Sequence, residues 1–233
     1  MAISINDTKT YSGTSNGETL TPTFGNSNTG CIVGISVSST TGGITAPTIT
    51  CDSHNMTLAA DATNTAGSNW NYTWIYYYIG SLLGAKNVVI GYSVSILHCS
   101  FALAVREIHQ TTPLADHCSS ITTNPSFTAA DISGIILTCV ANSNHTTPTN
   151  GVNYTSIITA TYCDTAKRTS GISKTETLVW GSLDVPTIVG ASFSPAPSGG
   201  QSVAISPFLI FMNRILWDKK NCLWQPKGLL NGI

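Results

Sequence analysis

Apolar and polar residues alternate with a period of two along most of this chain, and helical periodicity is nearly absent. Because the side chains of a strand point alternately to opposite faces, this alternation predicts strands with one buried face. Turn signals separate the candidate strands, for example Asn16-Gly17, Gly42-Gly43 and Asn150-Gly151. Many short strands between Gly, Asn and Pro turns are typical of a sandwich or a barrel. The sequence therefore predicts an all-β, antiparallel β-sandwich.

The predicted strands are short segments that carry this alternation or an apolar run of strand length. They are Thr19–Phe24, Cys31–Ser38, Thr48–Cys51, Met56–Ala60, Tyr72–Ile79, Asn87–Ser93, Cys99–Ile108, Gly134–Ala141, Ser156–Cys163, Thr177–Trp180, Thr187–Phe193 and Ser202–Met212. The chain has 233 residues, of which 42% are hydrophobic, so it has enough apolar surface to build a sizeable core.

Charged residues make up only 9% of the chain, against about 25% in an average globular protein. The net charge is −1, so no basic field attracts a nucleic-acid backbone. The N-terminal residues show no basic and apolar signal pattern, and the apolar run 205–212 is short and contains Pro207. We therefore expect synthesis in the cytosol and neither a nucleic-acid nor a membrane partner.

The seven cysteines are an odd number, which excludes complete internal pairing. Cys31, Cys99 and Cys139 each fall on the apolar face of a predicted strand, where a thiol acts as a small buried hydrophobe. Together with cytosolic synthesis, this predicts reduced, structural cysteines. The chain has no C-x-x-C pair, so we expect no structural metal.

Motifs for catalysis are missing from the sequence. No G-x-S-x-G pentapeptide, phosphate loop or dinucleotide fingerprint occurs, and the acidic residues are scattered over strand ends and turns. His109 and His117 flank a predicted loop, QTTPLAD, where a metal site and ordinary loop polarity explain the histidines equally well. We expect a protein that is not an enzyme and that uses no cofactor.

An aromatic stripe alternates along residues 68–80, SNWNYTWIYYYIG. On a strand, Trp70, Tyr72, Trp74, Tyr76 and Tyr78 share one face. If that face is exposed, Trp70, Trp74 and Tyr76 form a stacking platform for sugar rings. If it is buried, the rings supply core or subunit-interface area. The opposite face is also partly apolar, which favours burial on both sides and therefore the second interpretation.

The composition changes after about Val203, where the Thr, Ser and Asn content falls and large aromatic residues appear among basic ones. We predict a sandwich domain over residues 1–205, followed by a last strand and a C-terminal extension over 206–233. Aromatic and basic residues are enriched in protein interfaces. The extension is therefore either a partner anchor or a segment packed on its own domain; the anchor residues are Phe208, Phe211, Trp217 and Trp224.

A longer pattern spans Gly30 to Phe193. It consists of GCIVGISVSS, APTITCDSHNMTLAA, TWIYYYIGSLLGAKNVVIGYS, SFALAVREIHQTTPLAD and DISGIILTCVANSN. It resembles the jelly-roll or concanavalin-like sandwich modules of bacteriophage virion proteins and of some bacterial surface proteins. The cysteines are more numerous than in that pattern, and the residues after Met212 have no counterpart in it.

The resemblance implies a jelly-roll-like component of a virus particle, such as a capsid decoration protein or a tail component. Its partners would be other virion proteins, and it would form a homo-oligomer. It implies no catalytic residue. The alternative is a carbohydrate-binding or host-adhesion module that recognises a glycan on the host surface.

Overall fold

The computed structural model describes residues 2–66, 69–121, 126–128, 134–142, 149–150, 154–160, 163–169, 172, 175–178, 180–181 and 186–197. All of them lie in the first of two units, Met1–Pro197. Over these residues the structure contains strands and no helix. Correspondingly, the described ranges hold no helix that is long and apolar enough to span a membrane.

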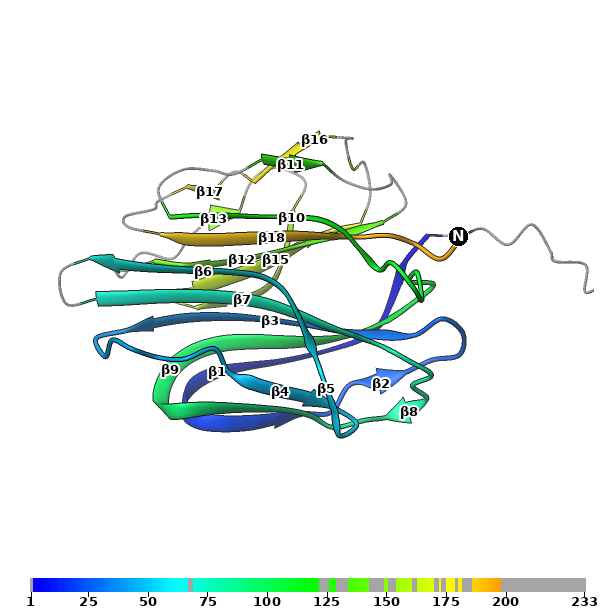
Figure 1. Ribbon diagram of the computed structural model, residues 1–233, viewed down its shortest axis with the longest axis horizontal. Coiled ribbons are helices and arrows are strands. Elements are labelled where there is room, and N and C mark those ends of the chain that lie inside the picture. Colours follow the sequence, from blue (N-terminus) through cyan, green and yellow to red (C-terminus); the bar gives the residue numbers. More distant parts are fainter. Residues whose placement is uncertain are drawn as a thin grey trace, which may run out of the picture. The chain divides into compact units, whose positions relative to one another are not determined.

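The larger of two main sheets has seven strands, in the order β5-β4-β9-β3-β7-β6, with β1 paired to β9 as well (Figure 1). All of its pairings are antiparallel. The strands are β1 (Ser4–Leu20), β3 (Gly30–Ser39), β4 (Thr48–Cys51), β5 (His54–Asn55), β6 (Thr57–Ala66), β7 (Asn69–Ile79) and β9 (Val88–Arg106).

The smaller main sheet has five antiparallel strands, in the order β10-β18-β12-β15-β14. They are β10 (Leu114–Ser120), β12 (Ile135–Ala141), β14 (Thr155–Ala160), β15 (Cys163–Arg168) and β18 (Thr187–Phe193). Three two-stranded pairs complete the described part: β2 (Thr23–Phe24) with β8 (Gly84–Ala85), β11 (Ser126–Thr128) with β16 (Thr175–Thr177), and β13 (Thr149–Asn150) with β17 (Trp180–Gly181).

The larger sheet curls because β1 and β9 bend together. The segment 88–91 of β9 pairs with β4, whereas the segment 98–105 pairs with β3. Between these segments the register with β1 shifts, from Ser15↔Ile96 to Gly17↔Gly91. Figure 1 shows the result, with β4 and β5 folded beneath β3 and β7. A strand bends at such irregularities, so the sheet covers part of its own inner face.

The curl gives the larger sheet a core on each face. On β3, the side chains of Cys31, Val33, Ile35 and Val37 fill the inside of the curl, whereas Ile32 points to the smaller sheet. The core inside the curl also contains residues from β4 and β9, among them Ile49, Val88 and Ile90. The core between the two sheets contains Phe101, Leu103, Ile135, Leu137, Val189 and Phe193.

The predicted all-β, antiparallel sandwich is confirmed by this architecture, while the finer jelly-roll connectivity stays a prediction. The predicted strands Thr48–Cys51 and Thr187–Phe193 match β4 and β18 residue for residue. The sequence prediction lacks β1 beyond its last two residues and lacks β10 entirely. His117 therefore lies on strand β10, and the expectation that it borders a loop is wrong. The predicted strand Ser202–Met212 and the domain boundary after residue 205 lie outside the described residues.

Candidate functional site

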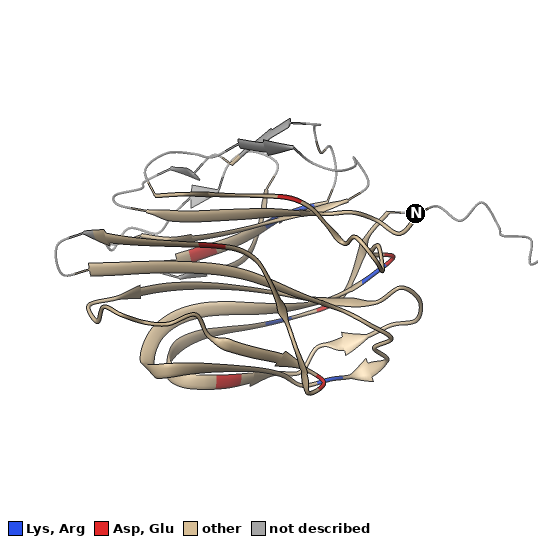
Figure 2. Cartoon of the chain, viewed as in Figure 1, with Lys and Arg blue, Asp and Glu red and all other residues tan. Residues whose placement is uncertain are grey.

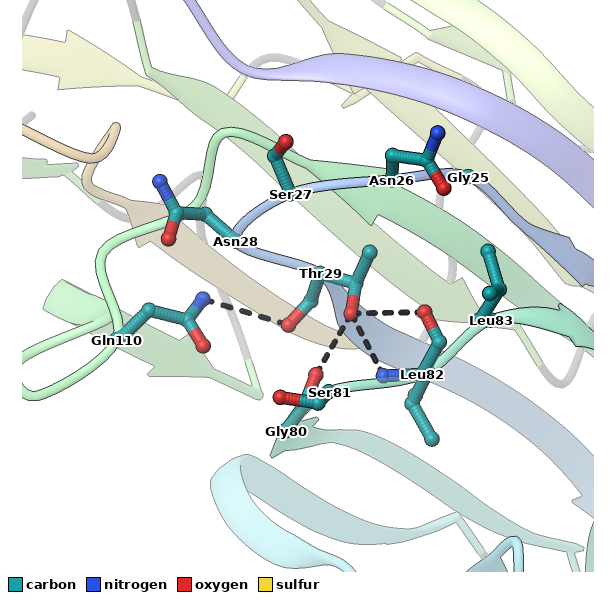
Figure 3. A pocket seen from close by; sticks show the side chains of 10 residues that line it. All are labelled: Gly25, Asn26, Ser27, Asn28, Thr29, Gly80, Ser81, Leu82, Leu83 and Gln110. Carbon is teal, nitrogen blue, oxygen red and sulfur yellow. Dashed lines mark hydrogen bonds between the residues drawn. The ribbon is translucent and has the colours of Figure 1, made fainter.

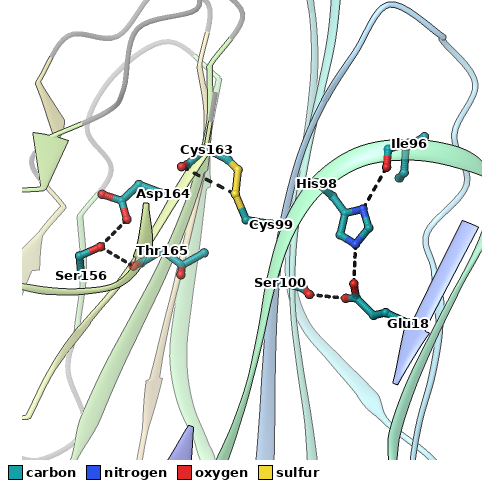
Figure 4. Close-up of a disulfide and its surroundings, with 9 residues drawn as sticks. All are labelled: Glu18, Ile96, His98, Cys99, Ser100, Ser156, Cys163, Asp164 and Thr165. Atoms are coloured by element: carbon teal, nitrogen blue, oxygen red, sulfur yellow. Dashed lines mark hydrogen bonds and ion pairs between the residues drawn. A yellow bond between two sulfur atoms is a disulfide. The ribbon is translucent and has the colours of Figure 1, made fainter. Parts of the chain in front are cut away.

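A buried acid, imidazole and hydroxyl meet inside the curl of the larger sheet (Figure 4). His98 Nε2 lies 2.8 Å from Glu18 Oε2, and the Ser100 hydroxyl donates to Glu18 Oε1. The exposed fraction of the side chain is 0% for His98 and 4% for Glu18. Because β1 and β9 bend together, the C-terminal end of β1 brings Glu18 to His98 and Ser100 on β9.

The hydrogen bonds of this cluster indicate how its protons are arranged. His98 Nδ1 is 3.1 Å from the carbonyl oxygen of Ile96. Since a carbonyl only accepts, Nδ1 carries a hydrogen. The contact between Nε2 and the Glu18 carboxyl also needs one proton, which the two groups share. The pair therefore has no net charge, which lowers the free-energy cost of burying it.

The order of these groups differs from that of a nucleophile, base and acid relay. In such a relay the imidazole lies between hydroxyl and carboxylate and removes the hydroxyl proton. Here the carboxylate of Glu18 lies in the middle, and the hydroxyl of Ser100 donates to it instead of to His98. The geometry is that of a polar network that ties β1 to β9.

Two tyrosine rings enclose the imidazole of His98. The Tyr11 ring stacks on it at 5.1 Å, and the Tyr92 ring lies at 4.6 Å with a tilt of 53°. The Tyr92 hydroxyl is buried and has no hydrogen-bond partner among the described residues. Burial, and secondarily the charge of Glu18, raises the pKa of Tyr92 well above its ordinary value. The cluster is therefore closed to solvent by aromatic rings.

The next residue along β9 corrects a prediction about the cysteines. Cys99 forms a disulfide with Cys163 of β15, which joins the two main sheets (Figure 4). The sequence predicted a reduced Cys99 on an apolar face. The predicted apolar face is correct, because Cys99 points into the space between the sheets. Cys163, which is 64 residues away in the chain, reaches the same space. Alternation within one strand gives no information about the residue opposite in another sheet.

The other described cysteines agree with the prediction of structural thiols. Cys31, Cys51 and Cys139 are free and fully buried, and Cys118 is free and half-buried. Burial raises the pKa of Cys31 and of Cys139 well above the ordinary value, and raises that of Cys118 to about 12. Such thiols are protonated at neutral pH and react slowly.

The predicted aromatic stripe is part of the core inside the curl. Tyr72, Trp74 and Tyr76 are 3%, 3% and 7% exposed, and the partly buried Trp70 and Tyr78 pack against the same core. Ring centroids are 6.3 Å apart for Trp70 and Tyr72 and 5.5 Å apart for Tyr72 and Trp74. The interpretation as core is confirmed. A sugar platform formed by Trp70, Trp74 and Tyr76 is wrong for this structure, because the curl covers the face that a sugar would need.

His109, the histidine before the predicted loop, organises the loop itself. His109 Nδ1 accepts the backbone N–H groups of Thr111 and Thr112, at 3.3 and 3.1 Å, and so fixes the loop before β10. The residues that the structure describes contain no group of three or more His, Cys, Asp and Glu side chains suited to a metal ion.

The predicted interface residues Phe208, Phe211, Trp217 and Trp224 lie outside the described residues.

A pocket of about 370 Å³ opens at one end of the larger sheet (Figure 3). Two loops form it, 25–29 between β2 and β3 and 80–83 between β7 and β8, together with Gln110 from the loop that follows β9. Its lining side chains are amides, hydroxyls and leucines, with no charged group. The sequence prediction did not include this site, although the turn residues Asn26, Ser27 and Asn28 mark its first loop.

Comparisons of the chain with known protein families, with curated proteins and with solved structures found no significant match.

Proposed function

We propose that this chain is a structural protein of a bacteriophage particle, a capsid decoration protein or a tail component, that acts by protein–protein contact. The resemblance noted above, which covers Gly30 to Phe193, suggests this class. The observation that carries the proposal is an exterior with very few charges, four of which form two ion pairs. In this proposal the protein is located in the virion and binds other virion proteins, including further copies of itself.

Charged residues are few and lie scattered along the described strands and loops (Figure 2). Lys9 Nζ lies 3.2 Å from Asp7, and Lys86 Nζ lies 2.9 Å from Asp52, so these charges are already paired. The Glu18 carboxylate is buried. Charged residues are depleted in the centres of protein interfaces because burying an unpaired charge costs free energy. A surface of Thr, Ser and Asn avoids that cost when a neighbour covers it.

Apolar side chains are exposed at several points of this surface, including Val89, Val94 and Leu97 on the outer side of β9. Their exposed fractions are 45%, 40% and 38%. They lie on a stretch of β9 near its bend, so they supply contact area on a strand that the two cores hold in place. A partner that covers them gains apolar burial at little cost in desolvated charge.

Contacts through the side chains of the sheet faces are more compatible with this sheet than pairing of its edge with a strand from another chain. The edge strand β1 has 17 residues and pairs only with β9 among the described strands. A long free edge invites pairing with other chains, and proteins prevent it with bulges and lysines. β1 contains two register shifts, at Ile5/Asp7 and at Ser15/Gly17, and the half-exposed Lys9. These features protect the edge and leave the faces available.

The proposal is tested on particles and on purified protein. Mass spectrometry of purified virions should find the chain in a fixed ratio to the major capsid or tail protein, and light scattering should show a defined homo-oligomer. Deletion of residues 214–233, and substitution of Phe208, Phe211, Trp217 and Trp224 by serine, should lower incorporation into particles. The double variant Lys219→Ala and Lys220→Ala is the matched control in the same segment. Absence of the chain from particles, combined with a monomer in solution, contradicts the proposal.

A further inference from the structure

Hydrogen bonds join the loops that form the pocket of Figure 3. Thr29 is 3% exposed, and its hydroxyl joins both loops: Oγ1 lies 2.6 Å from the Gly80 carbonyl oxygen and accepts the Leu82 N–H at 2.9 Å. The Gly80 N–H donates back to the Thr29 carbonyl oxygen at 3.4 Å. The two loops are thus locked together before any ligand binds, which lowers the entropy that binding would cost.

The third wall of the pocket is tied to the first loop in the same way. The Gln110 amide nitrogen donates to the carbonyl oxygens of Ile108 and Thr29, at 2.9 and 3.4 Å. The Ile108 N–H donates to the Asn28 carbonyl oxygen at 3.2 Å. Since the Gln110 nitrogen is engaged, its side-chain oxygen is identified as an acceptor that remains available.

The chemistry of the lining is neutral and rich in groups that both donate and accept. Asn26, Ser27, Asn28 and Ser81 are exposed, and their side chains make no hydrogen bond within the described part of the chain. Each amide and each hydroxyl offers at least one donor and one acceptor. Leu83, which is 63% exposed, adds an apolar surface at the rim.

We propose that this pocket binds a neutral saccharide, one sugar residue of a glycan. A sugar hydroxyl donates and accepts at the same atom, as the amides and hydroxyls of the lining do. The exposed Leu83 side chain can cover the C–H face of the ring. No charged group lines the pocket, so nothing there favours a phosphate, a carboxylate or an amine. The volume of about 370 Å³ lies within the range of about 300 to 1,000 Å³ that is usual for small-molecule sites.

This site differs from the aromatic stripe in residues and in position, and it does not depend on the proposed role in assembly. The stripe lies inside the curl, whereas the pocket is formed by loops at the ends of β3 and β7. A virion protein and a protein with no virion role could both carry it. Its test therefore measures binding directly and needs no particle.

The experiment is saturation-transfer NMR and calorimetry on the full chain. The neutral probes are glucose, galactose, mannose, N-acetylglucosamine and N-acetylgalactosamine, with their short oligosaccharides, and the charged probes are sialic acid and glucose 6-phosphate. The variants are Ser81→Ala and Asn28→Gly, because Asn28 has a φ of 41° that glycine adopts freely. The control is Ser53→Gly, which makes a similar change at a φ of 68° in the turn between β4 and β5, outside the pocket.

We expect at least one neutral sugar to bind, with about tenfold weaker affinity for Asn28→Gly or Ser81→Ala and unchanged affinity for Ser53→Gly. Three results overturn the proposal. They are no binding of any neutral probe, equal binding by the wild type and both pocket variants, and stronger binding of the charged probes than of the neutral ones.

Discussion

His98 Nε2 and Glu18 Oε2 are 2.8 Å apart although 80 positions separate the two residues in the chain. The contact exists because β1 and β9 bend at the same place and keep pairing on either side of the bend. It links the half of β9 that supports β4 to the half that supports β3. The shared proton between the two side chains thus stabilises the curl of the larger sheet.

Substitution of Glu18 tests this role. Glu18→Ala leaves the buried His98 Nε2 and the buried Ser100 hydroxyl without a hydrogen-bond partner, which should lower the free energy of unfolding by about 3 to 5 kcal/mol. Glu18→Gln should cost only about 1 kcal/mol. Its amide oxygen accepts from Ser100, and its nitrogen donates to Nε2 of a neutral His98 that keeps its hydrogen on Nδ1. Urea unfolding at pH 7 measures both values, and equal losses in the two variants would contradict the assigned hydrogen bonds.

Removal of the hydroxyl should have different effects on stability at two buried tyrosines, Tyr92 and Tyr72. Tyr92→Phe removes a hydroxyl that has no partner in the described structure, so stability should stay equal or rise by about 1 kcal/mol. Tyr72→Phe removes the acceptor of the buried Ile44 N–H, at 3.2 Å, and should cost about 1 to 3 kcal/mol. Thermal unfolding of the two variants measures both effects. Each variant is the control for the other, because both lose one oxygen atom from the same core.

The disulfide predicts a result for thiol counts and for stability. Titration with a thiol reagent should find five thiols per chain in denaturant and seven after reduction. Replacement of both Cys99 and Cys163 by alanine should lower the free energy of unfolding by about 2 to 4 kcal/mol, because the bond restricts the unfolded chain. Cys31→Ala, which changes a free buried thiol, is the control that separates loss of the bond from loss of packing. Seven thiols in denaturant without reductant would show that the bond does not form.

Sequence reasoning predicted the parts of the fold that depend on one strand at a time. The alternation of Cys31, Val33, Ile35 and Val37 placed these residues on one face, and the structure buries all four in one core. The aromatic stripe on β7 and the burial of both of its faces follow from the same periodicity. These features depend only on neighbouring residues in the chain.

The parts that sequence reasoning lacked depend on contacts between distant segments. β1 is almost entirely polar, and it is a strand because it pairs with β9 along nearly its whole length. The residues 93–95 interrupt the apolar pattern, so β9 was predicted as two strands, although it bends without ending. The pocket and the Cys99–Cys163 bond also require the spatial order of strands, which turn signals and alternation do not encode.

Packing between the two sheets predicts that a larger residue in place of Gly34 destabilises the protein. A Cβ atom there would meet the ring of Phe101 and Sγ of Cys139, which come from β9 and from the opposite sheet. Gly34→Ala should therefore destabilise the protein by about 1 to 3 kcal/mol through overpacking. Gly91→Ala is the milder control, since its nearest neighbour would be Thr48 Oγ1 at 3.1 Å. Equal stability of both variants in urea unfolding would argue against close contact of the sheets at this point.

Stability should fall at alkaline pH, and Tyr76 should account for part of the fall. Burial, with a smaller contribution from Asp61, raises the pKa of Tyr76 to about 12, whereas its ordinary value is 10.0. Between pH 10 and pH 12 the unfolded chain has lost this proton and the folded chain keeps it. Stability therefore decreases as pH rises through this interval and is fully present below it.

Tyr76→Phe should flatten this pH dependence. At pH 8 the variant should lose about 0.5 to 1.5 kcal/mol, because the Tyr76 hydroxyl donates to the Pro47 carbonyl oxygen at 3.3 Å. Near pH 11 the difference from the wild type should shrink, since phenylalanine has no proton to lose in the unfolded chain. Unfolding midpoints in urea between pH 8 and pH 11 measure the slope. Parallel curves for the two proteins would mean that Tyr76 ionises alike in the folded and unfolded chains, against the burial seen inside the curl.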